Sequence, residues 1–445
     1  MKQTLSRCRD AMRGRRSRRR IFLRGFALLG LAAVACSAAA GARTPPTPAP
    51  SSPTAATRGP RDASARVVRV ALGDGLAQVR VTSAGGWQLY ADDGRTVVAL
   101  TKPGERWMLE RDGTGIRARR DDSHPVSARE RTVLARPTDA DGQITFNDRR
   151  YRGELAITAT GDGLSVVNRV KMDDYLRGVV PLEIGTSAAA DASAVEAQAV
   201  AARSYAVTHL GSAGRLYDMR ATVADQVYGG VGAETSVGNF AVTATSGLVL
   251  LYAGQVVNAP YFSTCGGSTA EPQDVWRTSA EPYLRRVSDQ IPGTTHFYCE
   301  GAPKYRWTRA FGREDLRQNI ARYVRTLPGG GPVSSVRAVS VTEVTPAGRV
   351  GTLRVEADQR TIVLHGNEIR SALRLPSGEL LYSTYFSVAA AAGRDGIETL
   401  TLNGGGNGHG VGMCQAGAIG RARAGQDFRT ILRTYYPGTT VGTIE

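Results

Sequence analysis

Short runs of alternating apolar and polar residues dominate the chain from Val67 to about Leu164. Examples are VVRVAL, AQVRVTS, GWQLYADDGRTVVAL and ELAITAT. Alternation with a period of two is typical of strands that have one buried face. The triplets Asp92-Asp93-Gly94 and Gly161-Asp162-Gly163 contain the residue types that favour hairpin turns. We therefore predict a β-rich N-terminal domain over residues 66–160.

A helical period replaces this alternation between Ala192 and His209. Small and apolar residues recur there at intervals of three and four, namely at Ala194, Ala197, Val200, Ala201, Tyr205 and Thr208. This spacing predicts a helix that packs closely on a sheet, with Asp191 or Ser193 as its N-cap.

The segment before that helix, VVPLEIG, ends an apolar run in a single carboxylate, Glu183. Pro181 and Gly185 flank this acid, and both residue types disfavour a regular helix. We therefore expect an extended apolar run and a turn that present Glu183 ahead of the helix.

The pattern changes again after the strand-like stretch from Val249 to Thr264, which runs into CGGST. The sequence from Arg313 to Thr326 predicts a helix, and SVRAVSVTEVT and VGTLRVEA predict strands. These elements indicate an inserted α+β lobe over residues 301–400.

The last segment carries the Gly-rich run GGGNGHGVGMCQAGAIG and then a predicted helix that stops at Tyr435-Tyr436-Pro437-Gly438. The expected fold class is α+β. Its β-rich core combines residues 161–300 with residues 401–445, and the N-terminal β domain and the inserted lobe are added to it.

The N-terminus predicts an export signal over residues 1–35. A basic region precedes the apolar run GFALLGLAAVA, which is too short to span a bilayer, and RRRIFLR resembles a twin-arginine signal. The export signal can end in two ways, and both stay open. Ala33-Val34-Ala35 fits a cleavage site, whereas Cys36 fits a lipidated cysteine. Residues 36–65 are rich in Ala, Pro, Thr and Ser and predict a disordered linker. An exported protein of the periplasm or cell envelope is expected, with contact to a membrane only through a lipid on Cys36.

Charge supports the same interpretation. The 445 residues carry a formal net charge of +16, of which +9 falls in the first 35 residues and +7 on the remainder. The high pI is thus partly a targeting feature, and no basic-aromatic nucleic-acid module is evident. We expect no nucleic-acid partner, whereas a mildly basic mature chain suits an anionic polymer such as cell wall.

Glu183 is the strongest candidate for chemistry. A carboxyl group against apolar neighbours has a raised pKa, so it can hold a proton near neutral pH and act as an acid. A surface loop Glu or a helix-capping charge is the alternative interpretation. Hydrolytic glycosidases need two carboxylates, but Asp173, Asp174 and Asp225 form no clear pair with Glu183 in the sequence. No P-loop, HExxH or G-x-S-x-G motif is evident.

Three Gly-rich segments are candidates for close approach to a ligand. They are YFSTCGGST from Tyr261, DQVYGG from Asp225, and HGVGMCQ from His409. Gly404 to Gly412 contains six glycines, too many for a helix or a strand core. Amides, hydroxyls and phenols beside glycines suit hydrogen bonding to sugars.

The cysteines allow two assignments. Cys8 and Cys36 lie in the leader, and Cys265, Cys299 and Cys414 lie in three separate loops. With His409 or His296 the three loop cysteines make a Cys3His zinc site. A disulfide between Cys265 and Cys299 with Cys414 free is the alternative that export favours. Both stay open.

At these residues the chain resembles the SpoIID/LytB family of stage II sporulation protein D and amidase-enhancer proteins. The matching segments occur in family order over roughly Val166 to Thr440. They are MDDYLRGVVPLEIG, VEAQAVAARSYAV, DQVYGG, ATSGLVLLYAGQVVNAPYFSTCGGSTAEPQDVW, PYLRRVSD and GHGVGMCQAGAIGRARAGQDFRTILRTYYPGT.

The resemblance implies a peptidoglycan lytic transglycosylase that cleaves between N-acetylmuramic acid and N-acetylglucosamine with Glu183 as the catalytic acid. It implies that the STCGG and HGVGM segments line the glycan groove and that no cofactor is required. The predicted substrate-binding residues are Arg203, Tyr205, Gln226, Tyr228, Ser263, Thr264, Gly266, Gly267, His409 and Gln415.

The chain also departs from the family pattern. Some members hold zinc around the segment matched here by YDMRATVADQVYGG, but Met219, Arg220 and Asp225 offer no such ligand set. The twin-arginine-like leader and the inserted lobe favour a general envelope role over a sporulation role. The rival function is a non-catalytic glycan-binding module that stimulates a cell-wall amidase. A zinc hydrolase built on the three cysteines is a third hypothesis.

Overall fold

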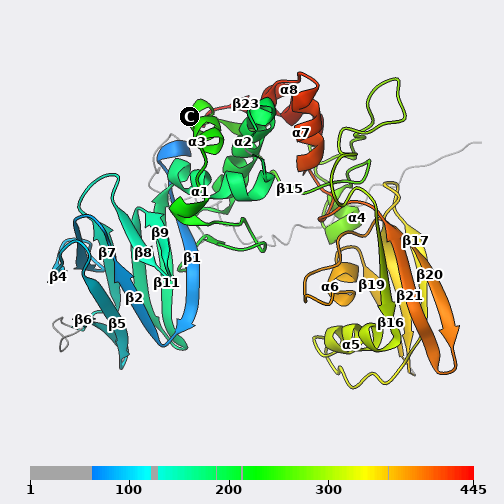
Figure 1. Ribbon diagram of the computed structural model, residues 1–445, viewed down its shortest axis with the longest axis horizontal. Helices are drawn as coiled ribbons and strands as arrows, with labels where there is room; N and C mark the ends of the chain where they lie inside the picture. The colour runs from blue at the N-terminus through cyan, green and yellow to red at the C-terminus, as the bar shows by residue number, and fades with distance from the viewer. Residues whose placement is uncertain (1–62, 122–128, 187, 212–213, 359, 445) are drawn as a thin grey trace, which may run out of the picture. The chain divides into compact units, whose positions relative to one another are not determined.

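The computed structural model describes residues 63–121, 129–186, 188–211, 214–358 and 360–444. It confirms a strand-rich α+β fold (Figure 1). The predicted export signal, Cys36 and nearly all of the predicted linker lie outside the described residues. In the part of the chain that the structure describes, no helix is long and apolar enough to cross a membrane.

Two sheets, in which most strand pairs are antiparallel, form the N-terminal part of the described chain. The larger has the strand order β12-β1-β11-β10-β7-β3-β4 and the smaller has the order β6-β5-β2-β8-β9. The strands are β1 (Val67–Leu76), β2 (Gln78–Thr82), β3 (Trp87–Ala91), β4 (Val97–Leu100), β5 (Arg106–Asp112), β6 (Gly115–Arg120), β7 (Thr132–Pro137), β8 (Gln143–Phe146), β9 (Arg149–Arg152), β10 (Glu154–Thr160), β11 (Gly163–Lys171) and β12 (Met219–Arg220).

Both predicted hairpin turns are present, because β3 pairs antiparallel with β4 and β10 pairs antiparallel with β11. The large sheet also takes β11 and β12 from beyond residue 160, so the predicted N-terminal domain and the segment that follows it share one sheet. Their apolar side chains belong to one buried cluster that continues into the helices.

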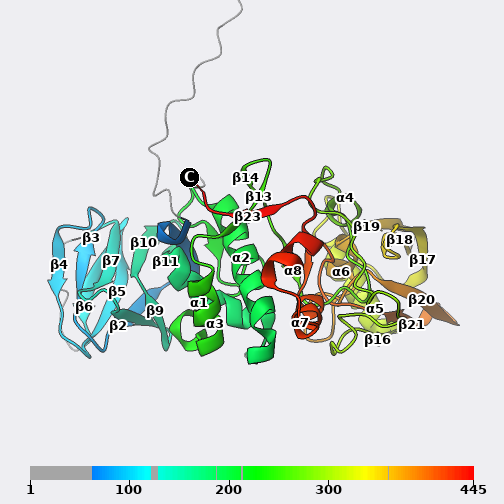
Figure 2. The same cartoon turned by 90° about the horizontal axis from the view of Figure 1, so that it is seen from above.

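A group of helices begins where β11 ends. The helices are α1 (Met172–Ile184), α2 (Ala192–His209), α3 (Ser236–Ala244), α7 (Gln415–Arg423) and α8 (Phe428–Tyr435), with short 3-10 turns at Ala63–Ala65, Ala189–Asp191 and Gly230–Ala233. Figure 2 shows α2 between α1 and α3 on one side and α7 and α8 on the other, and α2 contacts all four. The predicted bounds of α2 are confirmed. Asp191 occupies its N-cap position but makes no side-chain capping bond, because its carboxylate binds Arg423 instead.

Short strands bring distant parts of the chain together beside these helices. They are β13 (Val249–Tyr252), β14 (Gln255–Val256), β15 (Tyr261–Phe262), β22 (Met413–Cys414) and β23 (Thr440–Gly442). The strand-like stretch over Val249–Thr264 therefore forms three short strands. Strand β15 pairs in parallel with β22, so that Phe262 lies opposite Cys414. The STCGG and HGVGM segments thus lie side by side.

A second buried cluster runs from Trp307 to Leu402. It is built from two three-stranded sheets, β16-β21-β20 and β17-β18-β19, with helices α5 and α6. The bounds are β16 (Trp307–Gly312), α5 (Arg313–Val324), β17 (Val336–Val344), β18 (Val350–Ala357), β19 (Arg360–His365), α6 (Glu368–Ala372), β20 (Phe386–Gly393) and β21 (Gly396–Gly404). The preceding helix α4 spans Pro272–Trp276.

Candidate functional site

Glu183 lies in the last turn of helix α1, so the prediction of an extended run and a turn around it is wrong. Gly185 ends the helix in the left-handed region with φ of 66°, and its N–H donates to the carbonyl of Pro181. This is the conformation that glycine favours at a helix C-terminus. Pro181 is accommodated inside the helix, which is held by the burial of Val179 and Val180.

The Glu183 carboxylate is half-buried and accepts a hydrogen bond from the backbone N–H of Val227, with 2.7 Å between Val227 N and Glu183 Oε1. Burial raises the pKa of Glu183 above its usual value, and this effect exceeds the opposing hydrogen bonds from Val227 and from the side chain of Gln415. A carboxyl group in this position retains a proton to a higher pH than a solvated glutamate.

Phenols and an amide surround this acid. The side chain of the fully buried Gln226 accepts from Tyr175 OH at 2.9 Å and donates to Tyr261 OH at 2.9 Å. The charge of Glu183 contributes to the raised pKa values of Tyr175, Tyr261 and Tyr205, after burial as the main cause. Gln226 therefore fixes two of the phenols near Glu183. Tyr175 and Tyr261 were missed in the sequence as site residues, although both stand inside the segments that carry the resemblance.

Gln415 connects Glu183 with helix α2. It is the first residue of α7, and its Nε2 lies 3.3 Å from Oε1 of Gln198. Gln198 is fully buried in α2. The arrangement Gln198–Gln415–Glu183 joins α1, α2 and α7 at one point. Gln198 was not predicted, because a single amide in an Ala-rich helix gives no indication of which way it faces.

The other acids considered in the sequence are engaged elsewhere. Asp173 accepts from Arg203 at 2.8 Å, Asp174 pairs with Arg177 at 3.1 Å, and Asp225 accepts from the N–H of Arg220. Among the described residues, the groups that shift the pKa of Glu183 include no second carboxylate. Asp225 nevertheless lies near the same phenols, because its charge, like that of Glu183, contributes to the raised pKa values of Tyr175 and Tyr205.

A cavity of about 500 Å³ is lined by neighbours of Glu183, although Glu183 itself is not among its lining residues. Its lining includes Leu182, the residue before the acid, and Val227, whose N–H binds the acid. Arg149 and Arg150 also line it and add positive charge, and Asp148 adds one carboxylate.

Two predicted substrate-binding residues are structural in this fold. Arg203 is fully buried, forms an ion pair with Asp173 and donates to the carbonyls of Thr245 and Leu248. Tyr228 is also buried, and its hydroxyl donates to Asn168. The Arg203 side chain is therefore not presented to a ligand in this conformation, whereas Tyr228 is among the residues that line the cavity of about 500 Å³. Tyr205 is only half-buried, and its hydroxyl lies 3.5 Å from Asp225.

Of the predicted substrate-binding residues in the STCGG segment, only one is exposed. Ser263 is exposed, whereas Thr264, Gly266 and Gly267 are buried. Gly266 has φ of 73°, and a Cβ atom there would lie 2.9 Å from the backbone of Gly405. This glycine therefore allows the backbone of this segment to approach the Gly-rich run closely.

His409 has no ring nitrogen free for a metal or a substrate. Its Nε2 lies 2.9 Å from the carbonyl of Tyr261, and its Nδ1 accepts from the N–H of Val411. The neutral tautomer with a proton on Nε2 satisfies both contacts. Burial, with the nearby Arg370 charge, lowers the pKa of His409 to about 3. The assignment of His409 as a zinc ligand is therefore wrong, and the other candidate, His296, is exposed and paired with Glu300.

The three cysteines do meet, with an acid in place of the histidine. Ligand atoms of Cys265, Asp289, Cys299 and Cys414 all lie within 4.8 Å of one another, and all four residues are buried. The three cysteines are free. Asp289 was missed, since the only sequence feature that pointed to it was its place in the matching segment PYLRRVSD.

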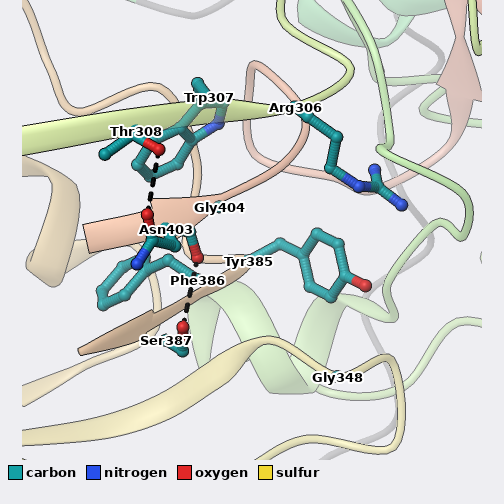
Figure 3. Close-up of a pocket in the computed structure, with 9 residues that line it drawn as sticks. All are labelled: Arg306, Trp307, Thr308, Gly348, Tyr385, Phe386, Ser387, Asn403 and Gly404. Carbon is teal, nitrogen blue, oxygen red and sulfur yellow. Dashed lines mark hydrogen bonds between the residues drawn. The ribbon is translucent and has the colours of Figure 1, made fainter. Parts of the chain in front are cut away.

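A larger cavity, of about 720 Å³, lies in the region of the second cluster (Figure 3). Trp307, Phe386 and Tyr385 contribute aromatic faces, and Asn403 and Arg306 contribute polar groups. Aromatic faces beside a few directional polar groups are the composition that suits a sugar.

Comparisons with known proteins agree with the sequence motifs. Residues 160–252 match the family described as stage II sporulation protein, and residues 291–412 match a family described as a domain of unknown function.

Three relatives cover much of the chain. Stage II sporulation protein D of Bacillus subtilis is 30% identical over 291 residues, which are 62% of this chain and 75% of the relative. The amidase enhancer of the same organism is 31% identical over 290 residues, 60% of this chain but only 40% of that protein. An uncharacterized protein of Brachyspira hyodysenteriae is 28% identical over 382 residues, 85% of this chain and 94% of the relative.

Proposed function

This chain belongs to the SpoIID family, and from that premise we propose that it is a peptidoglycan lytic transglycosylase of the cell envelope with Glu183 as its acid and base. The observation that carries the proposal is the half-buried carboxyl group of Glu183, whose pKa is raised and whose neighbours Leu182 and Val227 line a cavity. Export to the periplasm or envelope belongs to the proposal and rests on the predicted leader.

In this proposal the proton transfers follow a definite order. Val227 N–H donates to Oε1 of Glu183, and in this proposal Oε2 carries the proton of the neutral acid. Protonated Glu183 gives this proton to the glycosidic oxygen as the bond to the muramic C1 breaks. The resulting carboxylate then removes the proton from the muramic C6 hydroxyl, whose oxygen attacks C1 and closes a 1,6-anhydro ring. Glu183 ends protonated and ready for another cycle.

Asp148 lines the cavity and Asp225 lies beside Tyr205, but neither is among the groups that shift the pKa of Glu183, so in this proposal neither acts with it as a catalytic pair. A glycosidase needs a second carboxylate to activate water or to act as the nucleophile. An internal C6 hydroxyl supplies the nucleophile within the substrate, so one acid is sufficient.

The test is mass spectrometry of muropeptides after incubation of purified peptidoglycan, with and without stem peptides, with the protein lacking residues 1–36. We expect anhydro-muramyl products that Glu183→Gln reduces by at least about 10²–10⁴-fold, the usual contribution of a general acid. The matched control is Asp174→Asn, a carboxylate-to-amide change on the same helix at a surface pair. Normal turnover by Glu183→Gln would contradict the assignment.

The second candidate is a glycan-binding module that stimulates a cell-wall amidase, which the 31% identity to the amidase enhancer favours. In that case the protein binds glycan without forming a new product and increases the release of stem peptides by an amidase. Glu183→Gln would then leave the stimulation unchanged.

A further inference from the structure

We propose that Cys265, Cys299, Cys414 and Asp289 bind one zinc ion in a closed structural site. The proposal rests on this cluster alone and does not depend on the transglycosylase assignment.

The spacing of the ligand atoms suits a tetrahedral ion. The sulfur atoms of Cys265 and Cys299 lie 3.5 Å apart, and Cys265 Sγ lies 3.1 Å from Oδ2 of Asp289. Zinc–sulfur bonds of about 2.3 Å at a tetrahedral angle separate two sulfur atoms by about 3.7 Å. Small movements therefore place all four atoms around one ion. Four protein ligands leave no open position, which is the mark of a structural rather than a catalytic site.

Backbone amides are directed at two of the sulfurs. Cys414 Sγ accepts from the N–H of Cys265 at 3.2 Å and from the N–H of Gly417 at 3.3 Å, and Cys265 Sγ accepts from the N–H of Gly267 at 3.3 Å. Cys414 is also the N-cap of α7, where the helix dipole favours a negative charge. These donors favour the thiolate, which is the form that binds zinc.

Asp289 is oriented by a second set of contacts. Its Oδ1 accepts from Tyr435 OH at 2.6 Å and from Arg421 at 3.2 Å. Its Oδ2 is thereby directed toward the sulfurs. Such outer contacts fix metal-binding carboxylates in a single orientation.

A buried positive charge next to the cluster supports the zinc site independently of the ligand geometry. Arg349 is 1% exposed, and two of its guanidinium nitrogens, Nε and Nη1, have no hydrogen-bond partner among the described residues. Its third nitrogen donates to the carbonyl of Cys265.

A buried cation without a counter-ion is costly. Three thiolates and one carboxylate around a divalent ion carry a net charge of two negative units. Arg349 and Arg421 then balance it. Three neutral thiols give Arg349 no counter-ion, and a disulfide between Cys265 and Cys299 removes two of the possible thiolates.

The zinc would tie together three segments that are far apart in the chain: the STCGG loop, the loop with Asp289 and Cys299, and the start of α7. Gln415 follows Cys414 directly and reaches Glu183. The ion would therefore fix the residue that contacts the acid.

The first test measures metal content in the full-length chain with Cys8→Ser and Cys36→Ser, so that only the three cluster thiols remain. We expect about one zinc per chain by elemental mass spectrometry, and cobalt exchange should give thiolate-to-cobalt charge-transfer bands with tetrahedral d–d bands. Cys299→Ser should lower zinc retention under chelator at least about 10-fold, and Asp289→Asn should also weaken it while preserving shape and volume. His296→Ala, at an exposed histidine, should retain all the zinc.

If the protein holds no metal after reconstitution with zinc, and its intact mass is two hydrogen atoms below that of the fully reduced chain, the proposal is overturned in favour of the disulfide. Zinc retained in full by both Cys299→Ser and Asp289→Asn would also overturn it. Because the measurement needs no substrate, its failure leaves the transglycosylase proposal untouched, and a failure of Glu183→Gln leaves the zinc site untouched.

Discussion

The effect of the Gln415 side chain on the pKa of Glu183 gives a quantitative test of the acid. Gln415→Leu removes a donor to the carboxylate while keeping the size of the side chain. Because that donor stabilises the charged form and lowers the pKa of Glu183, its loss should raise this pKa further. A hydrogen bond to a charged group contributes about 1.5–3 kcal/mol, and one pKa unit corresponds to about 1.4 kcal/mol. Partial replacement by water reduces the effect, so we expect a rise of about one unit.

The sign of the effect on the reaction follows from the role of the acid. Cleavage needs protonated Glu183, so kcat/KM falls as the pH rises through the pKa of the free enzyme. The descending limb of the profile should therefore move about one pH unit upward in Gln415→Leu. The assay is the release of anhydro-muropeptides as a function of pH at low substrate concentration.

The control for this experiment is Gln426→Leu. Gln426 is also a glutamine of the C-terminal segment, but its side chain lies 3.4 Å from Tyr298 OH rather than at Glu183. Gln415→Leu also leaves Gln198 without its partner, at a cost of about 1–3 kcal/mol, so the assays are run below the measured melting temperature. A descending limb that does not move in Gln415→Leu, with activity retained, would refute the assignment of that limb to Glu183.

Three further predictions concern stability and binding. Asp191→Asn should destabilise the fold by about 1–3 kcal/mol near pH 7, because the Asp191 carboxylate accepts two hydrogen bonds from Arg423. The pKa of Asp191 is lowered in the folded state, so its contribution to the free energy of unfolding should be complete above the unfolded-state pKa and should be lost as the pH falls through the folded-state pKa, as measured by chemical denaturation. Arg203→Met should lower the free energy of unfolding by about 3–5 kcal/mol by leaving Asp173 without its cationic partner and with only the Ser246 hydroxyl bound to it, and equal stability in the variant would contradict a structural role. Tyr385→Ala should weaken glycan binding by about 0.5–1.5 kcal/mol in titration calorimetry if the cavity of Figure 3 stacks a sugar, and unchanged affinity would exclude that use.

Local patterns were sufficient where the structure depends on local chemistry. The α2 helix and the two hairpins follow from spacing and turn residues close together in the chain. Around Glu183 the same reasoning failed, because Pro181 was weighed as a helix breaker and Gly185 was not recognised as a C-terminal cap. Burial of the apolar side of α1 outweighs the cost of one proline.

The candidate site was predicted only in part, because it is assembled by tertiary contacts. The sequence identified Glu183 and the Gly-rich segments. It gives no local signal for the pairing of β15 with β22, which brings Cys414 beside Cys265. His409 was assigned to the metal from its chemistry, whereas the fold uses both of its nitrogens for backbone contacts. Asp289 takes its place because its loop returns to the same point.

The parallel pairing of β15 with β22 sets different limits on insertions of different size. Between the two strands the chain can lengthen at little cost, since each doubling of a loop adds only about 0.6 kcal/mol of closure entropy. Within the pair, a slip of one residue would put Met413 opposite Phe262 and turn Cys414 away from its present neighbours. A single added residue next to Met413 should therefore harm this protein more than the addition of an entire lobe between the strands.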